Sequence, residues 1–518
     1  MNKGGRQIAK AAIVVMALFA LSRLLGIVRQ AIVAALFGTG SELDAFVVAN
    51  QIPEAVFLIV GGGALGSAFI PVFADCLARD ERARAWRLAS SVANLVVIVT
   101  TVVAGLIALF APVLVRQVLA PGFDAQQQKL TVDLLRVMLI SPIVFGVSGI
   151  VMGALNAQQH FLLPALAASI YNVSIIGGSL LGQHLGTGVQ GIAVGVVAGS
   201  ALHLLIQVPM LPRYDARYSP TLGLKDPNVR EVGRLIAPRV LGTAVAQLNF
   251  LVNNSLASGM FTGAASAINY AWRLMLLPQG ILAQAVGTAA FPTFAEQAAQ
   301  EQYDNMRETL AATLRAVLFL SLPATAGLLV LGRPLVGFLF ERQEFTQSST
   351  DQVAWALAFF ALGLVGHSGL EVIARAFYAL HDTFTPVWVG SLAVALNIIL
   401  SLTLPSAFEA QGWMKHGGLA LANTIATLLE TAVLLALIRR RLNGIEGRRT
   451  LVAFVKSGLA ALAMIAALIG WQALLPNASP LLVGGAGVVL GIVIYLGAAL
   501  LLRAEELWAV VNMVRRRK

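Results

Sequence analysis

The chain has 518 residues, of which 58% are hydrophobic and only 12% charged, and its mean hydropathy is +0.80. A soluble protein of this length needs far more charge to cover its surface, so the composition excludes an ordinary soluble enzyme and indicates a membrane protein. The net charge of +11 comes from short basic clusters between apolar blocks, without interleaved aromatic residues. This pattern argues against a nucleic-acid partner and is typical of cytoplasmic anchors.

Stretches of about 20 apolar residues, each long enough to cross a bilayer, follow one another along the whole chain. We predict fourteen spans, near residues 11–37, 44–74, 88–112, 131–155, 162–183, 188–211, 232–258, 264–294, 310–332, 353–379, 384–404, 417–438, 451–474 and 480–502. The second is interrupted by Gly61-Gly62-Gly63 and the eighth by Pro278. The fold class is therefore an all-α polytopic membrane protein.

The N-terminus resembles a signal peptide, but its apolar run is too long and contains two arginines, so we expect an uncleaved first helix. With the N-terminus inside, the cytoplasmic loops and tails carry roughly two dozen Lys and Arg, against roughly five on the other side. This asymmetry predicts that both termini are cytoplasmic. The single cysteine, Cys76, excludes an intramolecular disulfide.

The two halves of the chain are related in sequence. GALGSAFIPVFAD (63–75) resembles QAVGTAAFPTFAE (284–296), and NAQQHFLLP (156–164) resembles YALHDTFTP (378–386). APVLVRQVLAPGF (111–123) resembles RPLVGFLFERQEF (333–345) at a similar offset. We predict two parallel six-helix repeats, which form an N-lobe (1–212), a cytoplasmic linker (213–230) and a C-lobe (231–441), followed by two extra helices and a basic tail (442–518).

Charged residues inside the apolar stretches are the candidate functional residues, because a charge at the bilayer centre costs roughly 2.5–3.5 kcal/mol unless it faces protein, water or a ligand. Arg23 and Arg29 lie in the first span, about 9 Å apart along a helix axis and about 120° apart around it. Arg239 and Arg273 lie in later spans, and the repeat pairs Arg239 with Arg23. Guanidinium groups in a hydrated cavity suit phosphate oxygens, so these arginines predict an anion site.

Other polar residues at membrane depth have both structural and functional interpretations. Asp44 either serves the cavity or caps the second helix. Glu371 and Arg375 are spaced for an ion pair within one helix, although a gating role stays open. Glu430, with Asn397 and Thr427, is a candidate site for a coupling cation or proton.

Four segments resemble the MurJ family, also called MviN: LSRLLGIVRQAIVAALFGTGSELDAFVVANQIP (21–53), GALGSAFIPVF, INYAWRLMLLPQGILAQAVGTAAFPTF (268–294) and ARAFYALHDTFTPV (374–387). The resemblance covers essentially the whole chain. It implies a flippase that moves lipid II, the undecaprenyl-pyrophosphate-linked peptidoglycan precursor, from the inner to the outer leaflet by alternating access. It also implies that the cavity arginines are Arg23, Arg29 and Arg273, and that the acidic residue of the second helix is Asp44.

The chain departs from the family at positions that are usually polar. Phe57 stands where the family commonly has an arginine, Gln30 where an acid often follows the second arginine, and Leu276 where a polar group is expected. These departures leave other functions open: a flippase for another polyprenyl-linked glycan, a cation-coupled small-molecule exporter of the same superfamily, or a scaffold for cell wall synthesis proteins.

No P-loop or HExxH motif occurs, so we expect no enzyme activity, no metal and no cofactor. Transport energy then comes from Na⁺, H⁺ or the membrane potential. We expect a monomer whose partners are the lipid-linked anion, the surrounding lipids and proteins of cell wall synthesis.

Overall fold

The computed structural model describes residues 3–60 and 63–508, and within these ranges the regular structure is entirely helical. The chain divides into two compact units, residues 1–265 with 342–345 and residues 266–341 with 346–518. Each unit is described by itself below.

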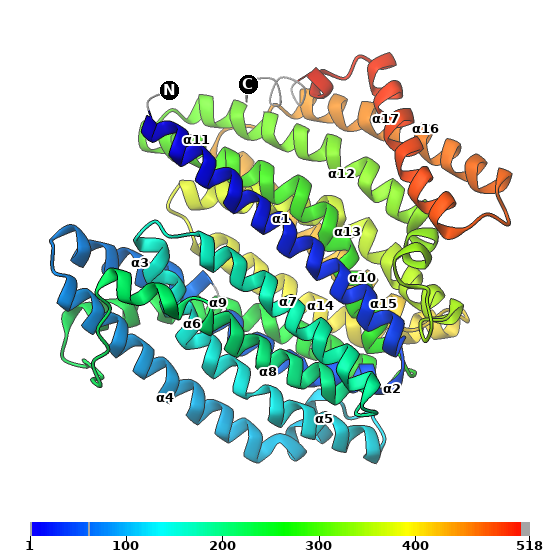
Figure 1. Ribbon diagram of the computed structural model, residues 1–518. Coiled ribbons are helices and arrows are strands. Elements are labelled where there is room, and N and C mark those ends of the chain that lie inside the picture. Colours follow the sequence, from blue (N-terminus) through cyan, green and yellow to red (C-terminus); the bar gives the residue numbers. More distant parts are fainter. Residues whose placement is uncertain (1–2, 61–62, 509–518) are drawn as a thin grey trace. The chain divides into compact units, whose positions relative to one another are not determined.

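Within the described residues, the first unit contains nine α-helices. They are α1 (Lys3–Phe37), α2 (Ser41–Val60), α3 (Gly63–Ala78), α4 (Arg82–Leu114), α5 (Ala125–Met138), α6 (Ile140–Ala157), α7 (Leu162–His184), α8 (Val189–Leu205) and α9 (Pro227–Ser258). Two short helices, η1 (Val115–Leu119) and η2 (Val208–Tyr214), extend α4 and follow α8. Helices α4, α6, α8 and α7 lie side by side in that order (Figure 1), and α1 packs on α7.

A buried cluster holds the first unit together at one end, where α3, α4, α6 and α9 meet. Phe69 and Phe73 are fully buried, and the Phe73 ring meets Trp86 edge-on at 5.4 Å. The indole N–H of Trp86 donates to the carbonyl of Tyr214 at 2.9 Å. Because Tyr214 precedes α9, this bond ties the segment between the two repeats to α4.

The second unit contains α10 (Ala264–Gln279), α11 (Ala285–Ala299), α12 (Tyr303–Phe340), α13 (Gln347–Ala379), α14 (Phe384–Ala410), α15 (His416–Arg441), α16 (Gly447–Leu474) and α17 (Gly487–Leu501). The π-helix η3 (Gly280–Gln284) joins α10 to α11, and η4 (Leu481–Ala486) precedes α17. The predicted interruption at Pro278 is present as a π-helical segment that begins two residues after it.

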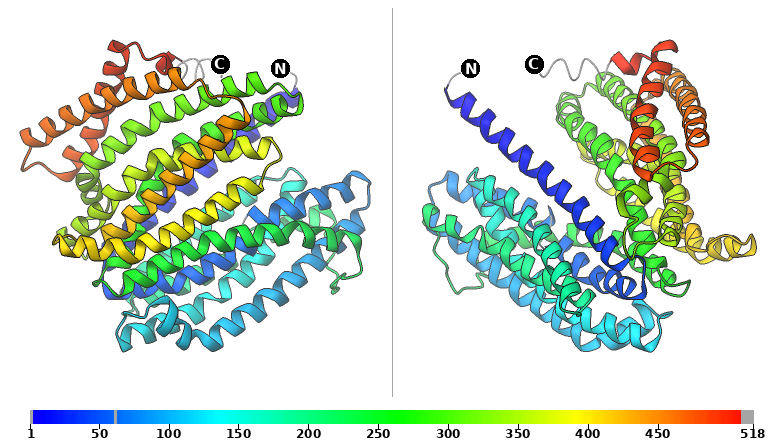
Figure 2. Two further views of the ribbon diagram at one scale, coloured as in Figure 1. Left: turned by 180° about the vertical axis from the view of Figure 1, so that it is seen from behind. Right: turned by 45° about the vertical axis from the view of Figure 1, so that its right-hand side comes forward.

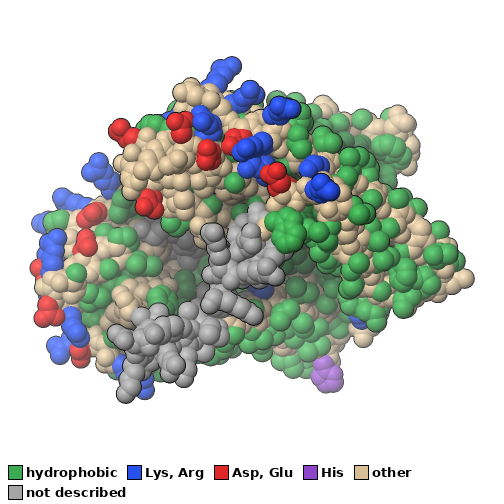
Figure 3. Space-filling view, turned by 90° about the horizontal axis from the view of Figure 1, so that it is seen from above, with side chains coloured by type: hydrophobic (Ala, Val, Ile, Leu, Met, Phe, Trp, Pro, Cys, Tyr) green, Lys and Arg blue, Asp and Glu red, His purple; other side chains and the backbone are tan. Residues whose placement is uncertain are grey.

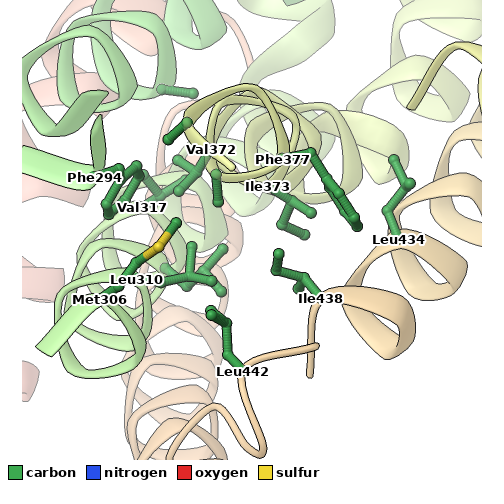
Figure 4. Packing of buried hydrophobic residues seen from close by; sticks show 14 of the residues in the cluster. Phe294, Met306, Leu310, Val317, Val372, Ile373, Phe377, Leu434, Ile438 and Leu442 are labelled. Carbon is green, nitrogen blue, oxygen red and sulfur yellow. The ribbon is translucent and has the colours of Figure 1, made fainter. Parts of the chain in front are cut away.

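Among the described residues, two apolar clusters stabilise the second unit. In one, Phe294, Met306, Phe377 and Ile438 bring α11, α12, α13 and α15 together (Figure 4). In the other, the added helices α16 and α17 pack on α12 (Figure 2), and the Tyr495 hydroxyl donates to the carbonyl of Phe319 at 2.6 Å.

Twelve helical segments among the described residues are long and apolar enough to cross a membrane, and each coincides with a predicted span. The remaining predicted spans, 44–74 and 232–258, fall on α2 with α3 and on α9. Residues 61–62 of the first lie outside the described residues. The fourth predicted span, 131–155, is not one helix but α5 and α6, which meet at Leu139 shortly before Pro142.

Candidate functional site

The arginines of α1 sit on different sides of that helix. The amide of Asn172 on α7 donates to the carbonyl of Ser22 at 3.3 Å, so the side of α1 that carries Ser22 faces α7. Arg29 follows Ser22 by seven residues, almost two full turns, and thus lies toward α7, where it is half-buried and has an interaction partner. Arg23 lies about 100° around the helix and is exposed.

Arg273 is half-buried on α10, and its neighbour Trp272 fixes the orientation of that helix. The Trp272 ring packs against Phe360 at 5.3 Å and His367 at 5.4 Å, both on α13. Arg239 lies on α9, but its side chain is outside the described residues. The structure thus places the four predicted arginines on α1, α9 and α10.

Asp44 is 1% exposed and lies in the first turn of α2, which begins at Ser41. Its carboxylate accepts a hydrogen bond of 2.6 Å from the backbone N–H of Gly263, after α9. A buried carboxylate needs such donors, because desolvation of an unpaired charge is very costly. Asp44 therefore joins segments that belong to different sequence repeats.

The ion pair expected between Glu371 and Arg375 is present on α13, with 2.6 Å between Oε1 and Nη1. The second guanidinium nitrogen of Arg375 donates to the Thr288 hydroxyl of α11 at 3.2 Å. This pair lines a pocket of about 280 Å³ in the second unit. The other lining residues are Phe291, Leu370, Ala374 and Tyr378.

The three candidates for ion coupling have separate surroundings. Asn397 is 1% exposed, accepts from the Ser401 hydroxyl at 3.2 Å, and has no partner for its amide nitrogen within the described part of the chain. Thr427 lies 3.4 Å from a ring nitrogen of His367. Glu430 is half-buried on α15, against Gly390 of α14. In the described ranges, no group of three or more His, Cys, Asp or Glu side chains is arranged to hold a metal.

Aromatic packing occupies the position where the family commonly has an arginine. The ring of Phe57 lies 4.5 Å from that of Phe145 on α6, and Phe145 also packs against Tyr171 and His203. The other two departures, Gln30 and Leu276, are both half-buried.

Half-buried histidines of the described residues make contacts between helices that are absent from the sequence predictions. His203 of α8 lies 2.7 Å from the Ser148 hydroxyl of α6, and the Gln207 amide donates to the same hydroxyl at 3.0 Å. In the second unit, His367 of α13 contacts Asn423 of α15 at 3.1 Å. A single histidine within an apolar span is the sequence feature that could have indicated each contact, but sequence spacing does not reveal the histidine's partner on another helix.

The surface fits a membrane location. On the face shown in Figure 3, hydrophobic side chains cover large areas, and Lys and Arg side chains occur near Asp and Glu. Exposed apolar residues also follow one side of α4, among them Val99, Val102, Leu106 and Leu109. Contiguous exposed apolar surface of this kind is typical of contact with lipid.

Comparison with known proteins gives consistent matches over most of the chain. The family model described as "Lipid II flippase MurJ" matches residues 33–483. The probable lipid II flippase MurJ of Vibrio cholerae serotype O1 is 30% identical over 444 residues, which cover 83% of this chain and 82% of the relative.

Two solved structures share the fold. A lipid II flippase MurJ in an inward closed conformation superposes with a TM-score of 0.80 at 24% identity, over 95% of this chain and 99% of that chain. An inward-facing multidrug resistance MATE transporter of the MOP superfamily superposes with a TM-score of 0.68 at 14% identity, over 84% of this chain and 99% of that one. The chain therefore belongs to the lipid II flippase MurJ family and is a multi-pass transporter of the bacterial inner membrane rather than an enzyme.

Proposed function

We propose that this protein flips lipid II from the inner to the outer leaflet of the inner membrane by alternating access, in support of peptidoglycan synthesis. The observation that carries the proposal is the family match over residues 33–483, which includes Arg239 and Arg273 and begins after Arg23 and Arg29. Relatives that match over most of their length carry this function in their names.

The proposed topology has fourteen spans with both termini cytoplasmic, in two parallel six-helix lobes (1–212 and 231–441) joined by the segment 213–230, with α16 and α17 as additions. Twelve apolar helices support this count, and α2 with α3 and the 32-residue α9 supply the other two spans. With this topology, the turns that follow α1 and α9 lie at the outer side.

Substrate binding rests on Arg23, Arg29 and Arg273, with Arg239 as a further contributor. The pyrophosphate of lipid II brings negative charge across an apolar slab, and guanidinium groups replace part of its hydration with charge-assisted hydrogen bonds. Binding of the anion also relieves the repulsion between the arginines, which favours closure around the headgroup while the polyprenyl tail stays in lipid.

Two polar pairs are suited to gating. Asp44 holds Gly263 at what we propose is the outer end, and outward opening requires this bond to break. Glu371 and Arg375 lie on the wall of the 280 Å³ pocket, toward the C-terminal end of α13, which the proposed topology places on the cytoplasmic side. If either pair breaks and its members bind other groups, the inward-open and outward-open conformations change in relative stability.

Energy coupling is proposed to involve Glu430, Asn397 and Thr427, by way of Na⁺, H⁺ or the membrane potential. A potential of 100 mV changes the free energy by about 2.3 kcal/mol per charge moved. Moving an anionic headgroup outward is favoured by an inside-negative potential. We further propose that the protein acts as a monomer among membrane lipids and interacts with cell wall synthesis proteins.

A flipping assay in vesicles tests the function. Purified protein is reconstituted with fluorescent lipid II, or with another polyprenyl-pyrophosphate-linked glycan, and outer-leaflet headgroup is quantified over time. We expect lipid II to be translocated faster than the other glycan. Equal rates would indicate a broader lipid-linked glycan flippase, and the absence of both activities with export of a small cation would overturn the proposal.

A further inference from the structure

A close backbone contact joins the loop between η1 and α5 to the end of α9. Gly122 donates its N–H to the Ser258 hydroxyl at 3.2 Å. A Cβ added at Gly122 would lie 2.5 Å from the nitrogen of Gly259 and 2.6 Å from the carbonyl oxygen of Ser258. Real Cβ atoms do not approach backbone so closely, so only glycine fits at position 122 in this arrangement.

A second contact of the same kind joins the segment 342–345 to the end of α1. Glu344 donates its N–H to the carbonyl of Ala35 at 3.0 Å. Gly38, with a φ of +58°, packs its Cα directly against the Glu344 carbonyl, and an added Cβ would overlap that oxygen. Phe345 is 1% exposed, which anchors the segment in the first unit.

The repeat relates these two contacts to each other. The matched segments 111–123 and 333–345 align Gly122 with Glu344 and Phe123 with Phe345. Gly38 and Gly259 are the residues that directly follow α1 and α9, the first helices of the two repeats. Each repeat therefore donates one loop N–H to the end of the other repeat's first helix. The same type of contact thus occurs twice, once for each repeat.

We propose that these paired contacts form the outer seal of the transporter, closed in this structure, and that they must separate before the headgroup can leave on the outer side. The inference rests on the proposed alternating-access function and its topology. It adds Gly38, Gly122, Ser258 and Glu344 as the residues that set how tightly the outer side closes.

The seal differs from a gate of interdigitated side chains because its contact surfaces are backbone. Such surfaces fit in one register only and cannot adjust by rotamer changes, so a single added methyl group opposes closure. Separation breaks the hydrogen bonds donated by Gly122 and Glu344, in addition to the bond between Gly263 and Asp44.

Cysteine labelling tests the seal independently of lipid II. Cys76, the sole cysteine, is replaced (Cys76→Ser), and Ala120→Cys supplies a reporter at a fully buried alanine two residues before Gly122. A membrane-impermeant thiol reagent is added from outside to intact cells. In this background, Gly122→Ala is expected to raise the labelling rate at least about tenfold, because overpacking shifts the population toward the open state.

Matched glycine variants serve as controls. Gly259→Ala changes the opposite side of the same contact, but an added Cβ there meets only the Leu256 carbonyl, at 3.8 Å. Gly105→Ala on α4 adds a Cβ with nothing within 4 Å. Both variants are expected to label at the parent rate, whereas Gly38→Ala is expected to label faster, as Gly122→Ala does.

A serine variant covers the case in which Gly122→Ala does not fold. Ser258→Ala removes the acceptor of the Gly122 N–H without adding an atom, and we expect it to label severalfold faster than the parent. Parent-rate labelling by folded Gly122→Ala or by Ser258→Ala, or equal acceleration by Gly259→Ala, would overturn the seal. Because the readout needs no lipid II, failure of the flipping assay would leave the labelling result interpretable.

Discussion

The carboxylate of Asp44 accepts a 2.6 Å hydrogen bond from the backbone N–H of Gly263, 219 residues further along the chain. The buried charge lies in the first turn of α2 and its donor in the turn before α10, so the two come from different sequence repeats. This contact lies at what we propose is the outer end of the protein, which opens during the transport cycle.

Replacing Asp44 with Asn keeps the shape of the side chain but removes its charge. Hydrogen bonds to charged groups contribute roughly 1.5–3 kcal/mol and neutral ones roughly 0.5–1.5, so we expect Asp44→Asn to lower stability by about 1 kcal/mol and Asp44→Ala by more. Thermal unfolding in detergent measures this loss. Glu42→Gln, at an exposed neighbour, is the control, and an unchanged unfolding temperature for Asp44→Ala would contradict the role of the bond.

Arg29 is the first arginine to test for substrate binding. Arg29→Ala is expected to weaken lipid II binding by roughly 10- to 100-fold, the equivalent of one lost charge-assisted contact. Arg29→Lys should retain part of the affinity, because an ammonium keeps the charge but not the planar pair of donors. Binding is measured with labelled lipid II in nanodiscs.

Complementation of cells depleted of their own flippase gives a second readout for the same variant. The exposed Arg116 provides the control substitution to Ala. Normal growth with Arg29→Ala at wild-type expression would rule out the proposed anion site at this position.

Phe57 offers a gain-of-function test. Phe57→Arg restores the residue common in the family and removes the 4.5 Å ring contact with Phe145, so stability should fall by about 0.5–1.5 kcal/mol or somewhat more. We expect tighter binding of pyrophosphate-linked lipid in compensation. Phe57→Leu removes the same stacking without adding charge, and equal affinities for the two variants would show that position 57 does not reach the substrate.

Asp382, in the loop between α13 and α14, gives the protein a defined response to acid. The backbone N–H of Thr385 donates to this carboxylate at 3.0 Å and lowers its pKa below the ordinary value of 3.8, with help from the Thr385 hydroxyl and from Arg441 at 2.6 Å. Because the folded-state pKa is the lower one, the stabilisation is complete well above pH 3.8 and is lost as the pH falls through the folded-state value.

Asp382→Asn should therefore unfold at a lower temperature than the parent at pH 7, and the difference should shrink toward pH 3. Calorimetry in an acid-tolerant detergent at several pH values measures this trend. A difference that stayed constant with pH would show that the ionised carboxylate is not the stabilising form.

Helix positions followed closely from hydropathy. The predicted span 162–183 is α7 (Leu162–His184), and 384–404 lies within α14 (Phe384–Ala410). Ends were less accurate: α12 runs from Tyr303 to Phe340, well beyond the predicted 310–332. Helices continue past the bilayer core into polar segments, where hydropathy no longer marks them.

The candidate site was predictable only in part. Charge within an apolar span singled out Arg29, Arg273 and Asp44, because the cost of burying charge can be recognised from one segment alone. The Glu371–Arg375 pair could also be predicted, since helical spacing fixes which residues meet within one helix. The His203–Ser148 and His367–Asn423 contacts could not be predicted from the sequence, because each joins two helices whose facing sides are set by packing.

The sequence by itself determined the membrane class, most of the helices and the family, because each of these depends on local hydropathy or on motifs that can be read along the chain. Only the tertiary structure decided that α9 groups with the first unit, that Asp44 meets Gly263, and that Gly122 and Gly38 contact the opposite repeat. These features depend on which surfaces of distant segments fit together at van der Waals distance, and that is a property of the packed chain rather than of any one stretch of it.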